Sequence, residues 1–296
     1  MTQPLIIGLG EILWDVFPDG PRFGGAPCNF ACSVAELASG SARVCMVSAV
    51  GQDNLGQEAL GSLIRHGVDT SYVQINSHDT GMVHVQLDEA GVASYRFADE
   101  SAWDHLAWST DLEQLARECN VVCFGTLGQR GGRSRETIRR FVQSTGPEAI
   151  RLLDINLRAP YDDETIMLES LELANVLKLN EDELPRVAHL LKLSGTPTDV
   201  LTKILLRYGL KCVALTRGAS GAVLAADCMT SEMPGVAVTV LDTVGAGDAY
   251  TAALVLGLLN GRPLDAINRH AVQVAGYACT QSGGTMRFPE ELRAVL

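Results

Sequence analysis

The sequence predicts an α/β fold, in which helices cover both faces of a mostly parallel sheet, with a small β-sheet attached to it. Three observations lead to this prediction. Short apolar runs of strand length alternate with segments of helical periodicity. These runs are apolar at consecutive positions, as in parallel strands that are buried on both faces. Residues 81–97 instead alternate between apolar and polar side chains, which is typical of a hairpin with one solvated face.

The strands and helices of the main sheet follow from these patterns in chain order. Strands are expected at residues 5–7, 44–50, 121–124, 151–155, 176–178, 213–216 and 236–241. Helices are expected at residues 29–37, 55–66, 134–143, 163–173, 198–208 and 249–259. Asn29 is the natural N-cap of the first helix, and Gly67 is expected just after the end of the second.

A second, smaller unit interrupts this alternation. Residues 81–98 form a hairpin pattern with a turn at 88–91, and residues 14–23 form another short β-like piece with a turn at 18–21. We expect the two pieces to form a small antiparallel sheet beside the main one. The chain has no internal repeat, low-complexity tract or long linker, so we expect residues 1–296 to form a single domain that carries this sheet.

The composition excludes several classes of protein. Hydrophobic residues make up 47% of the 296 residues, which is enough for a large buried core. The 35 acidic residues outnumber the 23 Lys and Arg residues, and the net charge is −12. Such a chain is poorly suited to nucleic acid or to an anionic membrane surface. Binding of an anionic ligand would have to rely on local backbone dipoles or a metal ion.

The apolar segments, the N-terminal residues and the cysteines indicate the cellular compartment of the protein. The longest apolar stretch near the C-terminal end, residues 251–259, is about half the ~20 residues that a membrane span needs. No positive charge precedes the apolar run at 5–9, so no secretory signal is expected. The eight cysteines form no CxxC pair, and we expect them to be reduced and buried. These features predict a cytoplasmic protein.

The motif Asp-Thr-Val-Gly-Ala-Gly-Asp at residues 242–248 is the strongest chemical signal. It precedes a helical pattern, so the N–H groups of Gly245, Ala246 and Gly247 would point to one place at a helix N-terminus. Such a place suits a phosphate or a developing oxyanion. Asp248 would stay ionised there and could accept a proton from a hydroxyl group. Alternatively, Asp248 only caps the helix.

A second group of polar residues surrounds the first strand. Glu11 and Asp15 follow that strand, at the end where α/β sheets bind ligands. Gly25 and Asn29 belong to the glycine-rich turn at 24–29, and the Asn29 amide could bind a hydroxylated ligand instead of capping the helix. Carboxylates that accept hydroxyl protons favour a neutral polyol, whereas either carboxylate alone could simply be solvated.

Three further strand ends carry polar side chains. Asn180 and Glu183 follow a buried strand and could hold water around Mg²⁺. Their spacing equally fits a capping box. The segment Asp154-x-Asn156-x-Arg158 has a similar composition and position. At 216–218, Thr-Arg-Gly forms another turn, in which the arginine either contacts phosphate or is exposed.

These motifs occur together and in order, and through them the chain resembles the ribokinase-like sugar kinases, the phosphofructokinase-B group, over essentially its whole length. DTVGAGD is highly specific for that group, and Gly-Gly-Ala-Pro with the early Glu-Ile-Leu-x-Asp looks most like its fructokinase branch. Ala26 stands where ribokinases usually have Lys. The motifs that carry the resemblance are GGAPCN at 24–29, VGQDNLG at 50–56, DINLR at 154–158, KLNEDE at 178–183, TRGASG at 216–221 and DTVGAGD at 242–248.

The resemblance implies a three-layer α/β/α fold in which the small sheet, from about 14–23 and 81–98, is a lid over the sugar site. It implies that Asp248 is the catalytic base beside an anion hole. The implied anion-hole residues are Gly245, Ala246 and Gly247, and the implied sugar-binding residues are Asp15, Gly25 and Asn29.

The same resemblance implies the nucleotide and ion sites. Thr216 and Gly218 look like a nucleotide-contacting turn, and Asn180 with Glu183 like a pair that positions Mg²⁺ through water. Asp242 and the carbonyl of Val244 resemble part of a K⁺ site. The rest of that site would come from residues 278–284, where Gln-Ser-Gly-Gly departs from the commoner pattern, so dependence on K⁺ stays open.

The implied function is an ATP-dependent sugar kinase that acts on a primary hydroxyl, with fructose as the leading substrate. The hairpin at 81–97 contains only one basic residue, Arg96, which favours an unphosphorylated sugar. Alternatives are kinases of 2-keto-3-deoxygluconate, ribose, tagatose 6-phosphate or nucleosides, and a non-catalytic sugar sensor. A nucleotide-dependent oxidoreductase is disfavoured because Gly8-x-Gly10 lacks the third glycine of the dinucleotide fingerprint.

We also expect a homodimer through the lid. Val83, Val85, Val92 and Phe97 would give the hairpin an apolar face, and such a face needs cover. The sugar site would cover part of it, and the same face of a second subunit would cover the rest in an isologous contact.

Overall fold

A nine-stranded, mostly parallel sheet forms the centre of the protein. The computed structural model describes residues 3–17, 20–87, 93–227 and 229–294. The strand order is β13-β12-β11-β10-β9-β8-β1-β4-β5, and only β12 runs antiparallel to its neighbours. The strands are β1 (Leu5–Leu9), β4 (Arg43–Gly51), β5 (Val73–Asn76), β8 (Val121–Phe124), β9 (Ile150–Asp154), β10 (Val176–Asn180), β11 (Cys212–Thr216), β12 (Ala222–Ala226) and β13 (Met229–Met233).

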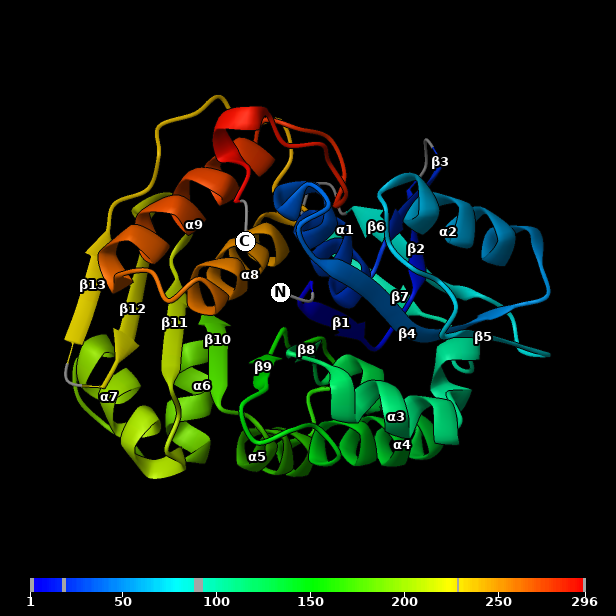
Figure 1. Ribbon diagram of the computed structural model, residues 1–296, viewed down its shortest axis with the longest axis horizontal. Helices are drawn as coiled ribbons and strands as arrows, with labels where there is room; N and C mark the ends of the chain where they lie inside the picture. The colour runs from blue at the N-terminus through cyan, green and yellow to red at the C-terminus, as the bar shows by residue number, and fades with distance from the viewer. Residues whose placement is uncertain (1–2, 18–19, 88–92, 228, 295–296) are drawn as a thin grey trace.

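Helices cover both faces of this sheet, which makes three layers (Figure 1). One face carries α1 (Ala26–Ala38), α8 (Ala246–Leu259) and α9 (Leu264–Ala278). The other face carries α3 (Thr110–Glu118), α4 (Gly132–Gln143), α5 (Glu164–Leu173), α6 (Glu183–Leu190) and α7 (Pro197–Tyr208). The predicted α/β fold with helices on each face is therefore confirmed.

A separate four-stranded sheet, which we call the small sheet, lies beside β4 and α2 (Asn54–Arg65). Its order is β3 (Gly20–Gly24), β2 (Leu13–Phe17), β6 (Gly81–Leu87) and β7 (Ala93–Phe97). The two hairpins predicted from the sequence pair through parallel β2 and β6, so the sheet is mixed and not purely antiparallel. The predicted turn centres at 18–19 and 88–91 lie outside the described residues.

Two predicted helix starts and one predicted strand were wrong. Helix α1 begins at Ala26, because Gly25 takes the N-cap position with φ 106° and Pro27 occupies the first turn, so Asn29 does not cap it. Helix α8 begins at Ala246. Residues 236–241 form no strand; Val236, Val240 and Leu241 are 44%, 59% and 69% exposed, so this apolar run is not sandwiched between layers.

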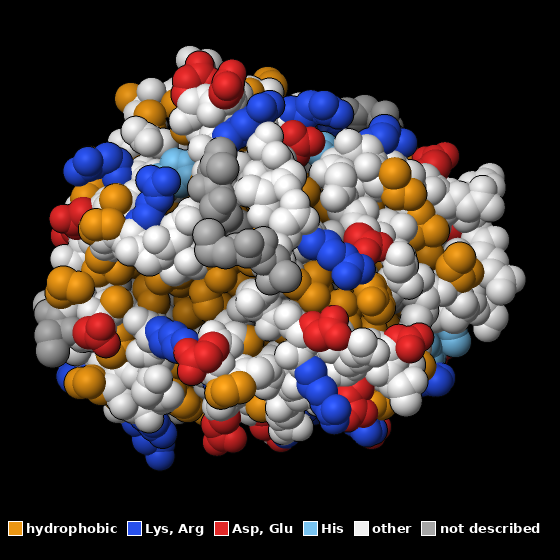
Figure 2. Space-filling model, in the orientation of Figure 1, with side chains coloured by type: hydrophobic (Ala, Val, Ile, Leu, Met, Phe, Trp, Pro, Cys, Tyr) orange, Lys and Arg blue, Asp and Glu red, His pale blue; other side chains and the backbone are white. Residues whose placement is uncertain are grey.

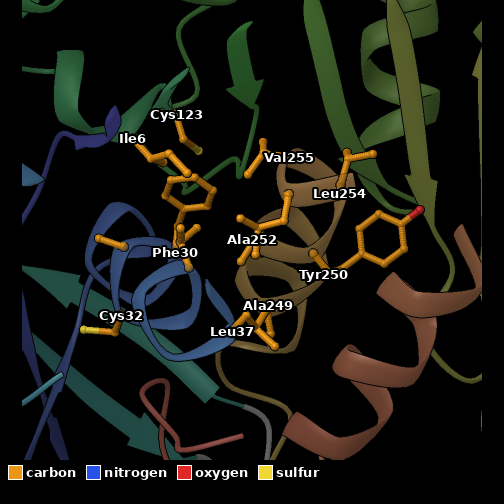
Figure 3. Packing of buried hydrophobic residues seen from close by; sticks show 14 of the residues in the cluster. Ile6, Phe30, Cys32, Leu37, Cys123, Ala249, Tyr250, Ala252, Leu254 and Val255 are labelled. Atoms are coloured by element: carbon orange, nitrogen blue, oxygen red, sulfur yellow. The ribbon is translucent and has the colours of Figure 1, made fainter. Parts of the chain in front are cut away.

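Helices α1 and α8 pack against each other directly, and this contact positions the candidate site. Phe30 of α1 lies between Ile6 of β1 and Ala252 of α8 (Figure 3). Helix α8 is buried at every position from Ala249 to Gly257, as expected of a helix between a sheet and two other helices. The residues that precede this core on each helix, Asn29 and Asp248, are thereby held close together.

The small sheet turns one apolar face toward its own chain. Val83 is 2% exposed and packs with Leu13, Trp103 and Leu127. Phe97 packs edge-on against Tyr161, with ring centroids 5.6 Å apart. Val83 therefore needs no second subunit for cover, whereas Phe97 is half-buried and borders the cleft. The side chain of Val85 and all of Val92 lie outside the described residues.

Other expectations from composition can be checked on the described residues. All seven described cysteines are free thiols; six are buried and Cys279 is half-buried. Within the described part of the chain, no helix combines the length and apolar character needed to cross a bilayer. Asp and Glu side chains are interspersed with Lys and Arg on the face in Figure 2, so the negative charge is not gathered in one patch there.

Candidate active site

A cleft of about 950 Å³ lies between the small sheet, the carboxyl ends of the main strands and the N-terminus of α8. It borders β1, where the strand order reverses direction along the chain and where α/β sheets place ligands. Eleven of the thirteen residues proposed from the sequence line it: Asp15, Gly25, Asn29, Asn180, Thr216, Gly218, Val244, Gly245, Ala246, Gly247 and Asp248. Glu183 and Asp242 do not line it.

Asp248 lies in the first turn of α8, and its position depends on the glycine that precedes the helix. Gly245 is the N-cap residue with φ 77°, a conformation that favours glycine. A Cβ atom at this position would lie 2.6 Å from the carbonyl oxygen of Gly284, so only glycine fits this close contact between two backbones. The Asp248 side chain makes no capping bond and turns instead toward α1.

Asn29 holds the Asp248 carboxylate in place. Its Nδ2 atom donates a hydrogen bond of 2.8 Å to Oδ2 of Asp248. Asn29 is 5% exposed, its Oδ1 atom is buried without a partner among the described residues, and the Gly284 backbone packs on its amide. Both simple alternatives from the sequence, a capping Asn29 and a capping Asp248, are therefore replaced by a bond between the two side chains.

Burial and neighbouring charges change the pKa of Asp248. Burial raises the pKa of Asp248 from 3.8 to about 6, and the nearby Asp154 carboxylate acts in the same direction. Lys178, the bond from Asn29 and Arg158 oppose this rise. The helix N-terminus alone was expected to keep the carboxylate ionised; burial makes it a stronger base than that expectation implied, while leaving it largely ionised at neutral pH.

Only part of the predicted anion hole has free N–H groups. The Ala246 N–H already donates to the Thr243 carbonyl at 3.3 Å. In the described part of the chain, the Gly247 N–H has no such partner. A Cβ atom on Gly247 would lie 3.1 Å from Nζ of Lys178, so an ammonium group adjoins the same place. The positive end of α8 and Lys178 together make this end of the cleft attractive to an anion.

Lys178 is itself buried and ion-paired. Its Nζ atom lies 3.0 Å from Oδ1 of Asp154, and Thr251 donates a hydrogen bond of 3.1 Å to the other Asp154 oxygen. Burial alone would lower the pKa of Lys178, but the carboxylates of Asp154, Glu183 and Asp248 together raise it above its ordinary value. The lysine therefore stays protonated beside the cleft.

Asp15 lines the cleft from β2. Burial raises the pKa of Asp15 from 3.8 to about 6, while Arg158 lowers it and Asp242 raises it. Gly25, with φ 106°, lets the chain pass within contact of the Glu11 carbonyl, where a Cβ atom would clash at 2.6 Å. Asp15, Asn29 and Arg158 thus offer acceptors and donors to one polar ligand.

Glu11 lies deeper, beside a small internal cavity of about 10 Å³ that also touches Asp154 and Asp248. Glu11 is 3% exposed, and its Oε2 atom has no hydrogen-bond partner among the described residues. Burial raises the pKa of Glu11 from 4.5 to about 7. A carboxylic acid that holds its proton near neutral pH therefore lies behind the Asp248 side chain.

Asn180 and Glu183 form the reciprocal pair that a capping box predicts. Oδ1 of Asn180 accepts a bond of 2.9 Å from the Glu183 N–H, and Oε2 of Glu183 accepts one of 2.8 Å from the Asn180 N–H. The other Glu183 oxygen accepts from the Leu157 N–H at 2.8 Å. Glu183 is 4% exposed, so it lies below the cleft surface that Asn180 reaches.

Another part of the cleft is lined by Thr216 and Gly218 and extends to α9. Arg217, between them, pairs with Glu232 at 2.8 Å on the surface and does not line the cleft. The irregular segment at 235–240 forms one wall, and Val272, Gly276 and Cys279 form another. The exposed apolar side chains of the misassigned run at 236–241 therefore border a groove suited to a flat, partly apolar group.

Asp242 is engaged by the backbone around the α8 turn. Its Oδ1 atom accepts from the Val244 N–H at 3.0 Å, and its Oδ2 atom accepts from the Gly283 N–H at 2.9 Å. The segments 242–244 and 279–284 are thus brought together as the resemblance implies. Arg22 of the small sheet lies 3.8 Å from the same Oδ2 atom, so a cation already neighbours this carboxylate.

From the sequence, Lys178 received no role, Glu11 was considered only as an acceptor for a polyol, and Asp154 and Arg158 only as members of a polar segment after a strand. The available signal was their position in the parallel sheet: Asp154 ends β9, and Glu11 and Arg158 follow strands, whereas Lys178 lies in the middle of β10. Their pairing could not be predicted. Lys178 and Asp154 are 24 residues apart, and Asn29 and Asp248 are 219 residues apart.

Comparison with known proteins agrees with this geometry. The family model described as pfkB family carbohydrate kinase matches residues 20–291. An uncharacterized sugar kinase from Pyrococcus horikoshii is 30% identical over 97% of this chain and 93% of its own, and its crystal structure superposes with a TM-score of 0.82 over 98% and 99% of the two chains. A fructokinase from Salmonella typhimurium is 30% identical over 87% of this chain and 85% of its own.

Proposed function

Because the chain belongs to the pfkB family of carbohydrate kinases, we propose that it transfers the γ-phosphoryl group of ATP to a primary hydroxyl of a small sugar, with fructose as the leading substrate. The observation that carries the proposal is the Asp248 carboxylate, held by Asn29 beside the N-terminus of α8. A kinase needs a base for the attacking hydroxyl and a cationic or dipolar site for the transferred group, and these two features adjoin in the cleft.

The residues divide into three tasks. Asp248 accepts the hydroxyl proton, and its pKa of about 6 suits a base that works near neutral pH. The free N–H of Gly247 and the ammonium of Lys178 stabilise charge on the phosphoryl group as it transfers. Asp15, Gly25 and Asn29 orient the sugar, while Thr216, Gly218 and the walls beyond them hold the nucleotide.

ATP as co-substrate is supported by a relative. The Pyrococcus horikoshii sugar kinase has a crystal structure in complex with ATP, at 26% sequence identity and a TM-score of 0.79. When bound, Mg²⁺ would neutralise part of the negative charge of the ATP phosphates. In this chain, Asn180 reaches the cleft, whereas both Glu183 oxygens already accept N–H bonds, which fits contact with an ion through water better than direct ligation.

A K⁺ site at Asp242 and Val244 is part of the proposal. Lone pairs on Asp242 and the carbonyl of Val244 are the oxygen ligands that such an ion needs. Arg22 lies 3.8 Å from Asp242 and could serve the same electrostatic purpose. Activity with and without K⁺, compared between the parent chain and Arg22→Ala, distinguishes the two: a K⁺ requirement that appears only in the variant means that the arginine replaces the ion.

One observation favours a second substrate class. Arg96, the only basic residue of the hairpin, is exposed, but Arg158 lines the cleft from outside the hairpin. The cleft thus contains an arginine that could bind an acidic group of an unphosphorylated sugar. Arginine recognises carboxylates well, so 2-keto-3-deoxygluconate is the second candidate.

A coupled ADP-release assay over a panel of sugars tests the proposal. Turnover with fructose and little with 2-keto-3-deoxygluconate would support the first candidate, and the reverse would support the second. The variant Arg158→Gln sharpens the comparison: it should raise the KM of an acidic sugar much more than that of fructose. No ADP release with any sugar would contradict the kinase and favour a non-catalytic sugar sensor.

The small sheet is proposed as a lid and as the site of a homodimer. Its pocket-facing side is covered by its own chain, so the dimer would use the opposite side, where Val16 and Met82 are partly exposed beside the exposed His84. The mass in solution tests this, with Val16→Lys as the disrupting variant. A monomeric parent chain would contradict the dimer and leave the kinase proposal unaffected.

A further inference from the structure

Two histidines and a glutamate meet at the base of the β6–β7 hairpin, away from the cleft. His78 lies in the connection from β5 to β6, and Glu100 and His105 lie in the segment that follows β7. One ligand atom from each of the three side chains lies within 4.8 Å of the other two. The two imidazole rings stack, with centroids 3.5 Å apart and planes 8° from parallel.

The backbone around these side chains is fixed by several hydrogen bonds. Asn76 donates to the Ala102 carbonyl at 2.9 Å, and the Ala102 N–H donates to the Asp79 carbonyl at 2.8 Å. Ser101 and Asp104 form a capping box at the start of the short helix that ends at His105. Hydrogen bonds therefore fix the backbone segments that carry the three side chains.

The chemistry of the cluster favours a cation. Nδ1 of His78 is buried and has no hydrogen-bond partner among the described residues. The segments 76–80 and 98–105 together contain four carboxylates and no Lys or Arg, and one of the four, Asp104, is paired with Arg130 at 2.7 Å. Two imidazoles and one carboxylate are typical ligands of Zn²⁺, whereas Mg²⁺ and Ca²⁺ prefer ligand sets of oxygen alone.

We propose that His78, Glu100 and His105 bind one Zn²⁺ ion, with water in the fourth position. Ligands of a tetrahedral zinc ion, at bond lengths of about 2.0–2.1 Å, lie about 3.3 Å apart, so ligand atoms that lie within 4.8 Å of one another must close by up to about 1.5 Å. The exposed Glu100 can supply part of this movement. One ring must also tilt, because two nitrogen lone pairs in parallel planes cannot point to one ion.

The site would connect the two ends of the hairpin. His78 lies three residues before β6 begins, and Glu100 lies three residues after β7 ends. A bound ion would hold the entering and leaving strands together at the base of the small sheet, which faces the cleft with Val83 and Phe97. Zinc is therefore expected to stabilise the hairpin without taking part in phosphoryl transfer, and the inference does not depend on the proposed activity.

Competition with a chromophoric zinc chelator tests the site on the metal-stripped full chain, with Mg²⁺ in excess to occupy sites of hard ligands. The parent chain should bind one zinc ion. Loss of an outer-shell partner costs a metal site about 10- to 100-fold in affinity, so loss of a ligand in His78→Gln or His105→Gln should cost at least that much. Glu100→Gln, at an exposed position, should reduce affinity less.

His84→Gln is the matched control, because His84 lies on the same hairpin outside the cluster. It should bind zinc like the parent chain. Zinc should also raise the melting temperature of the parent and of His84→Gln, but not of His78→Gln. Melting in EDTA shows whether a variant folds, and if His78→Gln does not, the exposed Glu100→Gln carries the test. A parent chain that binds no zinc, or cluster variants that bind it as tightly as the parent, would overturn the proposal.

Discussion

Replacing Asn29 by alanine should move the acid limb of the pH–activity profile to higher pH. Asn29 donates a hydrogen bond of 2.8 Å to Asp248, whose pKa is about 6. A bond donated to a carboxylate stabilises its ionised form, so losing the bond raises the pKa. Since the proposed base must be ionised to accept a proton, activity falls as the pH drops through this pKa.

The size of the shift follows from the strength of the bond. A hydrogen bond to a charged group contributes about 1.5–3 kcal/mol, and one pKa unit corresponds to about 1.36 kcal/mol. The shift should therefore be about one to two units, from about 6 to between about 7 and 8. Water that enters the space left by the amide would partly replace the bond, so a value near one unit is expected.

The assay is kcat/KM for the sugar between pH 5 and 9. Asn29 is also a proposed sugar ligand, so its loss can lower kcat/KM at every pH. The comparison therefore uses the pH at the midpoint of the acid limb and not the maximal value of kcat/KM. Asn29→Asp is the matched variant: a second carboxylate beside Asp248 should shift the limb upward at least as far. Thr216→Val, at the nucleotide end, should leave the limb in place. Limbs of Asn29→Ala and the parent chain that superpose would refute the assignment of Asp248 as the titrating base.

Three other variants test separate parts of the site. Asp248→Asn should retain binding of both substrates but lower turnover by about 10²- to 10⁴-fold in single-turnover or steady-state assays, and near-normal turnover would contradict its role as base. Asp15→Ala should raise the KM of the sugar much more than that of ATP, because a carboxylate that accepts hydroxyl bonds of about 1.5–3 kcal/mol each is lost; equal effects would mean a structural role. Glu11→Gln should unfold at higher urea than the parent chain at pH 8 but not at pH 4. The folded-state pKa of about 7 exceeds the ordinary 4.5, so the parent loses up to about 3 kcal/mol of stability as pH rises between these values, and an unchanged difference across this range would argue against the buried acid.

Positions at the ends of strands were the most predictable part of the site. The sheet requires apolar strands, so polar side chains at their ends stand out, and Asn180 and Thr216, the last residues of β10 and β11, were found in this way. The run at 236–241 failed for the complementary reason. Its valines are apolar because they form a wall of the cleft, and periodicity cannot distinguish a wall from a strand.

Helix starts and side-chain pairs were less predictable. Pro27 favours the first turn of a helix and could have signalled that α1 begins before Asn29. No local pattern could reveal that Asn29 binds Asp248, because the bond depends on how α1 packs against α8. The raised pKa values of Glu11 and Asp248 likewise come from burial, which only the packed structure supplies.

The net charge of −12 should affect how the binding of ATP depends on salt concentration. The field of the whole protein opposes an anion, so attraction must come from nearby groups such as Lys178, Arg158 and the N-terminus of α8. Lys178 is 5% exposed, so salt screens its attraction for the nucleotide only weakly. The repulsion between the nucleotide and the net negative charge acts over longer distances, and salt screens it strongly beyond a Debye length of about 8–10 Å. Raising the KCl concentration from about 0.05 to 0.15 M at constant free Mg²⁺ should therefore leave the KM of ATP unchanged or lower it, after correction for any activation by K⁺ with NaCl as the comparison. A steep rise of this KM in both salts would mean that exposed cations, and not the buried groups of the cleft, capture the nucleotide.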